Sequence, residues 1–452
     1  MDTVRALLRQ LINDFHESVL PSVSTGLIRR DLSLGKPLEP AVGNLAKVVT
    51  GIRRCGKTFR LYQEVVDLRV AGISADRICF LNFDDDRLKP YPPDIVSLAL
   101  EVFFELYPQA RSEGAYLFFD EIQDVPHWED AARRIVDTEK VTMYLTGSSS
   151  KLLSQDVATQ FRGRSIAFEL SPFSFAELAR SEGLPTQGSS LDNKEHASAL
   201  RHAFEAYLIG GGFPAARKLD DIERVQLLQT YVQLTVARDV VERSGYSNAA
   251  FVQNLARIVT ASSARDFSIN KVHVQSKARG YSPGRDSIAA MLVDFEDAHL
   301  AYGVYEFSRS VQKIRQGGFK MYSADPGLMS ALSLATTDGL TRALETAVYL
   351  ELRRRRKTGR MGEVSMLKLP SGKEVDFIWG DEAFGQAYAL VQVCVDMSDS
   401  KTRMRELSSL DEALEMFPDV SAVVVTFHEE GVEHLEHGDV NIVPAWRWML
   451  GA

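Results

Sequence analysis

The chain has 452 residues, of which 45% are hydrophobic and 25% are charged, so it is neither disordered nor fibrous and is long enough for two to four domains. The formal net charge of −9 excludes a generally basic nucleic-acid coat but leaves local basic patches open. The three cysteines, Cys55, Cys79 and Cys394, stand far apart and indicate neither a disulfide framework nor a CxxC zinc site.

Residues 1–40 predict an amphipathic helix followed by a linker that contains GKPLEP. The first 20 residues carry charges throughout, so they lack the uninterrupted apolar core of a signal peptide. Apolar runs elsewhere in the sequence do not approach the roughly 20 residues of a membrane helix. We therefore expect a soluble cytoplasmic protein with no membrane partner.

The stretch GIRRCGKT fits the pattern G-x-x-x-x-G-K-[ST]. An apolar strand, LAKVVT, precedes it, and a segment with helical periodicity follows, so bound phosphates would lie at a helix N-terminus. In this pattern backbone N–H groups surround the phosphates, the lysine reaches the β- and γ-phosphates, and the hydroxyl binds Mg²⁺. The sequence thus predicts an ATP-binding loop made of Gly51, Ile52, Arg53, Arg54, Cys55, Gly56, Lys57 and Thr58.

A second strand, in GAYLFFDEIQDV, is apolar up to two consecutive acids. The carboxyl ends of strands are where open α/β sheets bind ligands. We expect Asp120 to hold the Mg²⁺, directly or through water, and Glu121 to orient the attacking water.

A third strand, VTMYLTGSSS, ends in hydroxyl residues, of which Ser148 is the candidate sensor of the γ-phosphate. A predicted helix through about Phe161 follows, and Arg162 and Arg164 come at its end, before the strand SIAFEL. Arginines at a helix end commonly complement the helix dipole. Their position between two strands of the core also makes them candidate arginine fingers for a neighbouring subunit of a homo-oligomer, and the sequence leaves both roles open.

The segments GIRRCGKT, LFFDEIQ, LTGSSSKLLS and FRGRSIAFELSPFSFAEL, in this order, resemble the archaeal-type AAA ATPases of prokaryotes. YLIGGGFPAA, KMYSADPGL and the stretch from ALETAVYLELRRR to GKEVDFIW resemble the same family, so the resemblance covers nearly the whole chain. It implies an α/β fold: a P-loop AAA+-type parallel-sheet core, a helical lid, a winged helix and a C-terminal PD-(D/E)xK nuclease-like domain. The expected divisions are 1–40 for the N-terminal helix and linker, 41–175 for the core, 176–246 for the lid, 247–335 for the winged helix and 336–452 for the nuclease-like domain.

The expected winged helix combines a short helix, a longer one in SPGRDSIAAMLVDFEDAHLA, and two strands, YGVYEFSRS and GGFKMYS. Basic residues surround it and are candidate contacts to DNA phosphates; packing against protein is the alternative. They are Lys277, Arg279, Arg285, Arg309, Lys313, Arg315 and Lys320.

The expected nuclease-like domain has two acids in suitable places, Glu345 on a helix and Asp376 on a strand. A PD-(D/E)xK nuclease needs a further acid and then a lysine two residues on, where this sequence has Gln392 and Cys394. A neutral amide and a thiol replace neither group well, because Mg²⁺ prefers carboxylate and water oxygens. We expect the fold without the nuclease chemistry, with Glu351 as a candidate substitute acid.

The basic run from Arg353 to Lys357 is expected to complement a helix C-terminus, with phosphate contact as the alternative. The predicted function is an Mg²⁺-dependent ATPase whose cycle moves the other domains against DNA or another macromolecule. Two alternatives remain: an ATP-regulated metal-dependent nuclease, and a nucleotide-dependent DNA-binding switch with negligible turnover. A GTPase is disfavoured because no N/T-K-x-D motif follows the core.

Overall fold

The computed structural model describes residues 2–148, 163–281, 283–308, 318–334, 336–355, 364–381, 386–418 and 420–451. The chain folds into two compact units, residues 1–170 and 171–452. Four predicted functional residues, Arg162, Arg309, Lys313 and Arg315, and the end of the basic run, Arg356 and Lys357, lie outside the described residues.

The N-terminal unit is built on a sheet of five parallel strands in the order β2-β3-β4-β1-β5. The strands are β1 (Ala46–Thr50), β2 (Ile78–Asn82), β3 (Ala115–Asp120), β4 (Val141–Gly147) and β5 (Ser165–Glu169). Because β4 lies between β1 and β3, the carboxyl ends of these three strands are neighbours at one edge of the sheet. This confirms the predicted α/β fold with a P-loop AAA+-type core.

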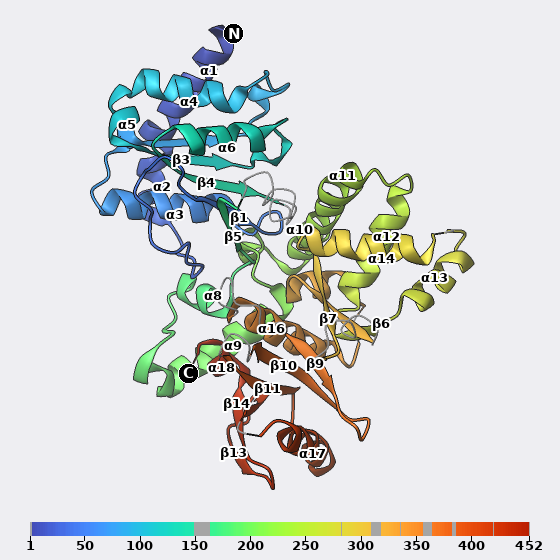
Figure 1. Cartoon of the computed structure of the whole chain (residues 1–452). Coiled ribbons are helices and arrows are strands. Elements are labelled where there is room, and N and C mark those ends of the chain that lie inside the picture. Colours follow the sequence, from blue (N-terminus) through green and yellow to red (C-terminus); the bar gives the residue numbers. More distant parts are fainter. Residues whose placement is uncertain are drawn as a thin grey trace. The chain divides into compact units, whose positions relative to one another are not determined.

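Helices cover both faces of this sheet (Figure 1). They are α1 (Asp2–Asp14), α2 (Leu20–Gly26), α3 (Lys57–Val70), α4 (Ile95–Leu106), α5 (Pro108–Glu113) and α6 (Trp128–Thr138), with a π-helical turn at Phe15–Val19 and 3₁₀ turns at Ala75–Arg77, Asp86–Leu88 and Ile122–Asp124. On one face an aliphatic core joins α1, α4 and α6 to the strands. On the other face Phe80, Phe118 and Tyr144 stack in register across β2, β3 and β4. Alternation along each strand therefore separates the two cores.

Helices make up most of the first half of the C-terminal unit. They are α8 (Phe175–Ser181), α9 (Lys194–Gly210), α10 (Asp221–Thr235), α11 (Glu242–Ser244), α12 (Ala249–Ala261), α13 (Ile269–Ala278) and α14 (Arg285–Asp297), with 3₁₀ turns at Gly188–Asp192 and Pro214–Lys218 and a π turn at Val236–Val241. A three-stranded antiparallel sheet follows in the order β6-β8-β7, and its strands are β6 (Arg265–Phe267), β7 (Ala301–Tyr305) and β8 (Phe319–Ser323). The expected pair of strands after the long helix is thus present.

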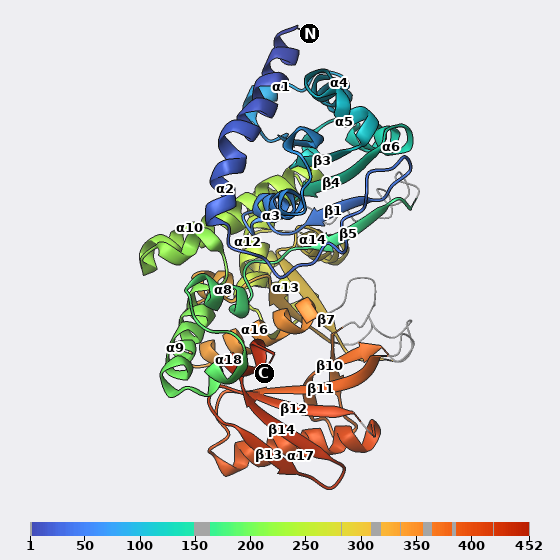
Figure 2. The same ribbon diagram turned by 90° about the vertical axis from the view of Figure 1, so that its left-hand side faces the viewer.

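A six-stranded mixed sheet occupies the end of the chain in the order β13-β14-β12-β11-β10-β9. Its strands are β9 (Ser365–Lys368), β10 (Glu374–Asp381), β11 (Gln386–Cys394), β12 (Ser421–Thr426), β13 (Gly431–His434) and β14 (Asp439–Pro444). The helices around it are α15 (Pro326–Leu332), α16 (Gly339–Arg355), α17 (Ser400–Met416) and α18 (Ala445–Met449). Figure 2 shows α17 on one face of this sheet and α16 with α18 on the other.

Three of the motifs that carry the family resemblance meet around Gly212, which lies beside the buried carboxylate of Asp325. Its two oxygens accept the N–H groups of Gly212, at 2.7 Å, and Gly327, at 2.9 Å. Gly212 also accepts a hydrogen bond from the Phe173 N–H at 2.8 Å, and a Cβ at Gly212 would lie 2.2 Å from the Phe173 oxygen. The motifs SPFSF, GGGFP and DPG therefore serve packing, because close backbone approach excludes larger residues.

Across the described residues, every helix is too short or too polar to cross a membrane.

Candidate nucleotide site and C-terminal acid cluster

The glycine-rich loop connects β1 to α3, as the sequence predicts. Gly51 has φ +151°, and a Cβ there would lie 2.0 Å from the Leu170 oxygen. Gly56, just before α3, has φ +103°. Both positions therefore exclude larger side chains. The Lys57 side chain is 2% exposed, and its Nζ donates to the Gly51 oxygen at 3.1 Å. The loop thus holds the lysine by its own backbone.

Asp120, the last residue of β3, is fully buried between two threonine hydroxyls. Thr58 donates to its Oδ2 at 2.8 Å, and Thr146 of β4 donates to its Oδ1 at 2.5 Å. Burial raises the pKa of Asp120 to about 6, the neighbouring Glu121 adds to the rise, and the two hydroxyls oppose it. A hydroxyl and a carboxylate are the protein ligands that Mg²⁺ takes at such a loop, so this pair fits the ion.

Glu121 follows directly, with its backbone in the left-handed region at φ 52°. Its Oε1 lies 3.3 Å from Lys57 Nζ, and Gln123 donates to its Oε2 at 3.0 Å. Burial would raise the pKa of Glu121, but Lys57, Gln123 and Arg53 together lower it. The two adjacent acids therefore differ: Glu121 stays ionised more readily than Asp120, as suits separate roles.

Two further predicted residues lie at opposite edges of the sheet. Ser148 directly follows β4 and is buried at the carboxyl edge, beside the glycine-rich loop and the acids. Arg164 precedes β5 and forms an ion pair with Asp137 at the end of α6. Because β5 runs parallel to β1, Arg164 lies at the amino edge, about 16 Å along the strand from the phosphate loop. It cannot reach the site of its own subunit, and its action on a neighbouring subunit stays a prediction.

The N-terminal segment contributes a residue that the sequence analysis missed, Arg30. Its guanidinium is buried and donates to the Cys55 oxygen of the loop at 2.8 Å. Its backbone N–H donates to Gln63 Oε1 at 2.7 Å, and Gln63 Nε2 donates back to the Arg30 oxygen at 3.2 Å. The expected linker is thus fastened to the loop and to α3. A single arginine outside any periodic pattern gave no signal of this.

In the C-terminal unit, the two predicted acids, Glu345 and Asp376, surround one ammonium group. Lys320 Nζ lies 3.3 Å from Glu345 Oε1, 2.7 Å from Glu374 Oε1 and 3.8 Å from Asp376 Oδ1. Tyr322 donates to Glu345 Oε1 at 2.7 Å. The prediction that Lys320 contacts DNA phosphates is wrong, because its side chain is only 11% exposed and is committed to these acids.

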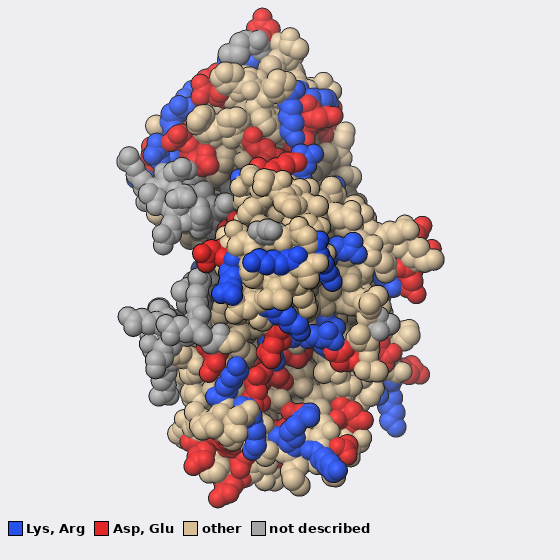
Figure 3. All heavy atoms as spheres, turned by 90° about the vertical axis from the view of Figure 1, so that its right-hand side faces the viewer, with Lys and Arg blue, Asp and Glu red and all other residues tan. Residues whose placement is uncertain are grey.

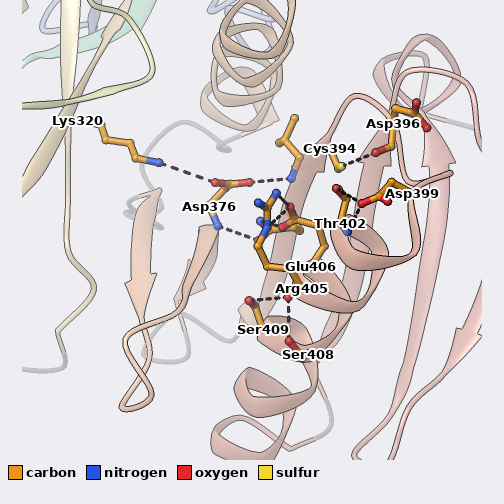
Figure 4. Close-up of polar contacts among 12 residues, drawn as sticks. Lys320, Asp376, Cys394, Asp396, Asp399, Thr402, Arg405, Glu406, Ser408 and Ser409 are labelled. Atoms are coloured by element: carbon orange, nitrogen blue, oxygen red, sulfur yellow. Dashed lines mark hydrogen bonds and ion pairs between the residues drawn. The ribbon is translucent and has the colours of Figure 1, made fainter. Parts of the chain in front are cut away.

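Gln392 and Cys394 are held by local hydrogen bonds. Gln392 Oε1 accepts the Asp376 N–H at 3.2 Å, and its Nε2 donates to Glu406 Oε2 at 2.7 Å. Cys394 Sγ donates to the Asp396 oxygen at 3.3 Å. Burial raises the pKa of Cys394 to about 11, so the thiol is neutral near pH 7. Figure 4 shows Asp376 between Lys320 on one side and Glu406 on the other.

The arginines at the end of α16 have specific partners. Arg355 Nε donates to Glu351 Oε1 at 3.0 Å, and its guanidinium carbon lies 4.0 Å from the Trp448 ring centroid. The guanidinium of Arg353 lies 3.8 Å from the Tyr302 ring centroid. Glu351 is therefore engaged by its own helix, and it is not among the described acids that pair with Lys320.

Two family matches cover much of the chain. Residues 43–179 match a family described as AAA domain, and residues 201–339 match a domain of unknown function. Among solved structures, the chain is similar to a Walker-type ATPase of Pyrococcus abyssi, with 14% identity, 64% of this chain and 90% of that chain covered, and a TM-score of 0.40. It is also similar to the Aeropyrum pernix ORC1 protein in complex with DNA, with 13% identity, 73% and 91% covered, and a TM-score of 0.25.

Two curated relatives are uncharacterized. One, from Haemophilus influenzae, is 24% identical over 356 residues, which are 79% of this chain and 84% of the relative. The other, MJ1544 of Methanocaldococcus jannaschii, is 30% identical over 450 residues, which are 96% of this chain and 95% of the relative. At that identity and coverage, and with residues 43–179 matching an AAA domain, the chain belongs to the family of MJ1544 and has an AAA-type P-loop ATPase core.

Proposed function

We propose that the protein is an Mg²⁺-dependent ATPase. The observation that carries the proposal is one set of contacts at the carboxyl edge of the sheet. It joins the loop residues Lys57 and Thr58 to the acids Glu121 and Asp120, with Thr146 behind them. An isolated glycine-rich loop would need none of these contacts, whereas ATP hydrolysis needs all of the groups.

Each residue has a role that follows from its chemistry. The backbone of the loop from Gly51 to Thr58 surrounds the phosphates, and Lys57 neutralises their charge. Thr58 and Asp120 hold Mg²⁺, which when bound screens the charge on the phosphates. Ser148 is the candidate contact to the γ-phosphate.

The contact between Lys57 and Glu121 bears on the proposed cycle. The Lys57 ammonium pairs with the Glu121 carboxylate at 3.3 Å. A γ-phosphate that takes over Lys57 leaves Glu121 free to accept a hydrogen bond from the attacking water. Gln123, which donates to the other oxygen of Glu121 at 3.0 Å, keeps the carboxylate oriented throughout.

The test compares Glu121→Gln with Lys57→Ala. We expect Glu121→Gln to keep nucleotide binding and to lower turnover by about two orders of magnitude or more, as the loss of a general base or orienting group does. Lys57→Ala should weaken binding itself. Glu129→Gln, at a half-buried glutamate on α6, serves as the matched control and should turn over like the wild type. Wild-type turnover in Glu121→Gln would remove Glu121 from the mechanism.

DNA is the second ligand that we propose, and the helices α12, α13 and α14 with β7 and β8 support it. Helix, helix and antiparallel strands in this order are what a winged helix requires. Four exposed basic residues lie on or beside α13 and α14: Lys271, Lys277, Arg279 and Arg285. Figure 3 faces this side of the unit and shows lysine and arginine side chains gathered there. Such residues neutralise phosphates without reading sequence.

Salt dependence tests this role. Lys277→Glu combined with Arg279→Glu should abolish duplex binding measured by fluorescence anisotropy, and the wild-type affinity should fall steeply with salt. Lys401→Glu, an exposed lysine on α17, makes a change of the same kind elsewhere on the unit and should have little effect. If both variants lose DNA affinity equally, the effect comes from net charge alone, and this outcome would contradict a specific DNA-binding surface.

We further propose that the six-stranded sheet and its helices form a nuclease-like domain without nuclease activity. The order α16, β9, β10, β11, α17 and β12 supports the fold, and the residues at positions 392 and 394 argue against the chemistry. Gln392 supplies no negative charge, and the neutral thiol of Cys394 cannot replace an ammonium group.

A further inference from the structure

A protein cation lies in the middle of the C-terminal acids. Lys320 reaches from β8 of the three-stranded sheet to Glu345 on α16 and to Glu374 and Asp376 on β10 of the six-stranded sheet. The side chains of Lys320, Glu345 and Asp376 are 11%, 11% and 14% exposed. One ammonium group thus connects three separate elements in a nearly closed site. Figure 4 shows its contact with Asp376.

The surroundings favour a charged ammonium. Burial alone would lower the pKa of Lys320, but the three acids raise it above its ordinary value. Burial also raises the pKa of Glu345 and of Asp376, so these acids carry less charge than exposed ones would. Beyond Asp376 the next acid is Glu406, which Arg405 and Gln392 already engage. Lys320 is therefore the direct cationic partner that the described residues offer to Glu345 and Asp376.

The spacing suits an ammonium better than a metal ion. The carboxylate oxygens stand 2.7 to 3.8 Å from Nζ, whereas Mg²⁺ and Ca²⁺ hold their oxygen ligands at about 2.0–2.6 Å. Tyr322 and the Val393 N–H fix one oxygen each of Glu345 and Asp376, at 2.7 and 2.8 Å. The acids would have to close in by about 1 Å around a metal of that size.

We propose that Lys320 is a built-in cation that takes the place of a divalent metal in this cluster and fastens β8 to α16 and β10. The cluster is then a metal-independent connection between the two sheets. The cluster then fails to bind a metal for two reasons. Gln392 and Cys394 replace the acid and the lysine that a nuclease needs, and the ammonium of Lys320 occupies the position of the cation. Removal of the ammonium should expose an acid cluster that takes up a divalent cation.

The test is Mn²⁺ binding to the full chain without nucleotide, measured by calorimetry in an Asp120→Asn background that removes the predicted metal ligand of the P-loop. We expect Lys320→Met to bind one more Mn²⁺ than the Lys320 protein does. Asp376→Asn added to it should weaken that binding at least tenfold. Mn²⁺ should also raise the melting temperature of Lys320→Met and leave that of Lys320→Met/Asp376→Asn unchanged. Asp411, Glu436 and His437 form another cluster that could hold a metal ion, with Asp411 half-buried and the other two exposed. This cluster is the same in all variants, so its contribution cancels in the comparison.

A control variant and a second design complete the test. Lys373→Met removes a more exposed lysine, 3.6 Å from Glu412 on the same unit, and should create no Mn²⁺ site. If Lys320→Met does not fold, Lys320→Met with Glu345→Gln removes one charge of each sign and is titrated in the same way. A folded variant without Lys320 that binds no extra Mn²⁺ would overturn the proposal. So would Mn²⁺ binding by the Lys320 protein that disappears in Asp376→Asn.

Discussion

Thr146→Val is the most informative change at the nucleotide site, because one hydroxyl serves both acids. Thr146 donates to Asp120 Oδ1 at 2.5 Å and accepts the Glu121 N–H at 2.9 Å. Valine keeps the volume of the side chain, so the loss is confined to the two hydrogen bonds. A hydrogen bond to a charged group contributes about 1.5–3 kcal/mol, and an unsatisfied buried N–H costs about 1–3 kcal/mol. Since the two terms share one group and are not additive, we expect a loss of about 3 kcal/mol in the free energy of unfolding.

The same change should weaken the metal site. Without the Thr146 hydroxyl, the pKa of Asp120 should rise above its value of about 6, because that hydrogen bond holds it down. Less of the carboxylate is then ionised near pH 7, and its orientation is no longer fixed. We expect the Mg²⁺ concentration for half-maximal ATP hydrolysis to rise about tenfold, which corresponds to about 1.4 kcal/mol.

Thr142→Val on the same strand separates the two effects. Thr142 is also fully buried, donates to the Leu38 oxygen at 2.8 Å and accepts from Asn44 Nδ2 at 2.9 Å, but at the amino end of β4. Both variants should lose stability in urea unfolding followed by hydrogen exchange of the peptides that cover β3 and β4. Only Thr146→Val should change the Mg²⁺ requirement. If both variants shift it equally, Thr146 acts through general stability and the reasoning fails.

Three further outcomes are expected. The pKa of Asp120 is raised to about 6 mainly by burial, so the charge of this carboxylate destabilises the folded state above pH 6. Asp120→Asn should therefore raise the melting temperature of the nucleotide-free protein at pH 8. This gain in melting temperature should shrink as the pH falls from 6 towards 4. If Arg162 or Arg164 is an arginine finger for a neighbouring subunit, ATP turnover per subunit should rise with protein concentration. Subunits with Arg164→Ala mixed with subunits carrying Glu121→Gln should then regain activity. If turnover does not depend on concentration and the arginine variants turn over like the wild type, the arginines only complement the helix dipole. Purified protein should cleave neither single- nor double-stranded DNA with Mg²⁺ or Mn²⁺, and Asp376→Ala should leave ATP hydrolysis largely intact; cleavage that is lost in Asp376→Ala and kept in Lys57→Ala would establish a nuclease.

The core of the nucleotide site could be predicted because it depends on where the strands end. In parallel strands, residues at the carboxyl ends meet at one edge, so Thr58, after the loop that follows β1, and Asp120, the last residue of β3, are expected to lie close together although 62 residues separate them. The role of Thr146 was less accessible. It depends on β4 lying directly beside β3, with Leu145 opposite Phe119, and the sequence does not reveal strand order.

The contacts of Arg30 and Lys320 could not be predicted for a different reason. Each is a single charged residue whose partners belong to no sequence motif that includes it. Arg30 contacts Cys55, 25 residues away, and Lys320 contacts Glu345, also 25 residues away. Because Lys320 is a basic residue in a predicted wing, its residue type alone favours a contact with DNA. The packing of β8 against α16 and β10 shows that the side chain is paired with acids instead.

The two acid sites of the chain differ in the group that supplies the positive charge. Asp120 is held by two neutral hydroxyl donors, while the ammonium of Lys57 pairs with Glu121. Neutral donors orient a carboxylate and leave its charge available to a metal ion. Asp376 and Glu345 are instead paired with the ammonium of Lys320. A buried carboxylate that already has a cationic partner gains little from a metal, because the metal would first have to displace that partner. From this contrast we expect metal dependence in the N-terminal unit and metal independence in the C-terminal one, with the charge of Lys320 as the property that distinguishes them.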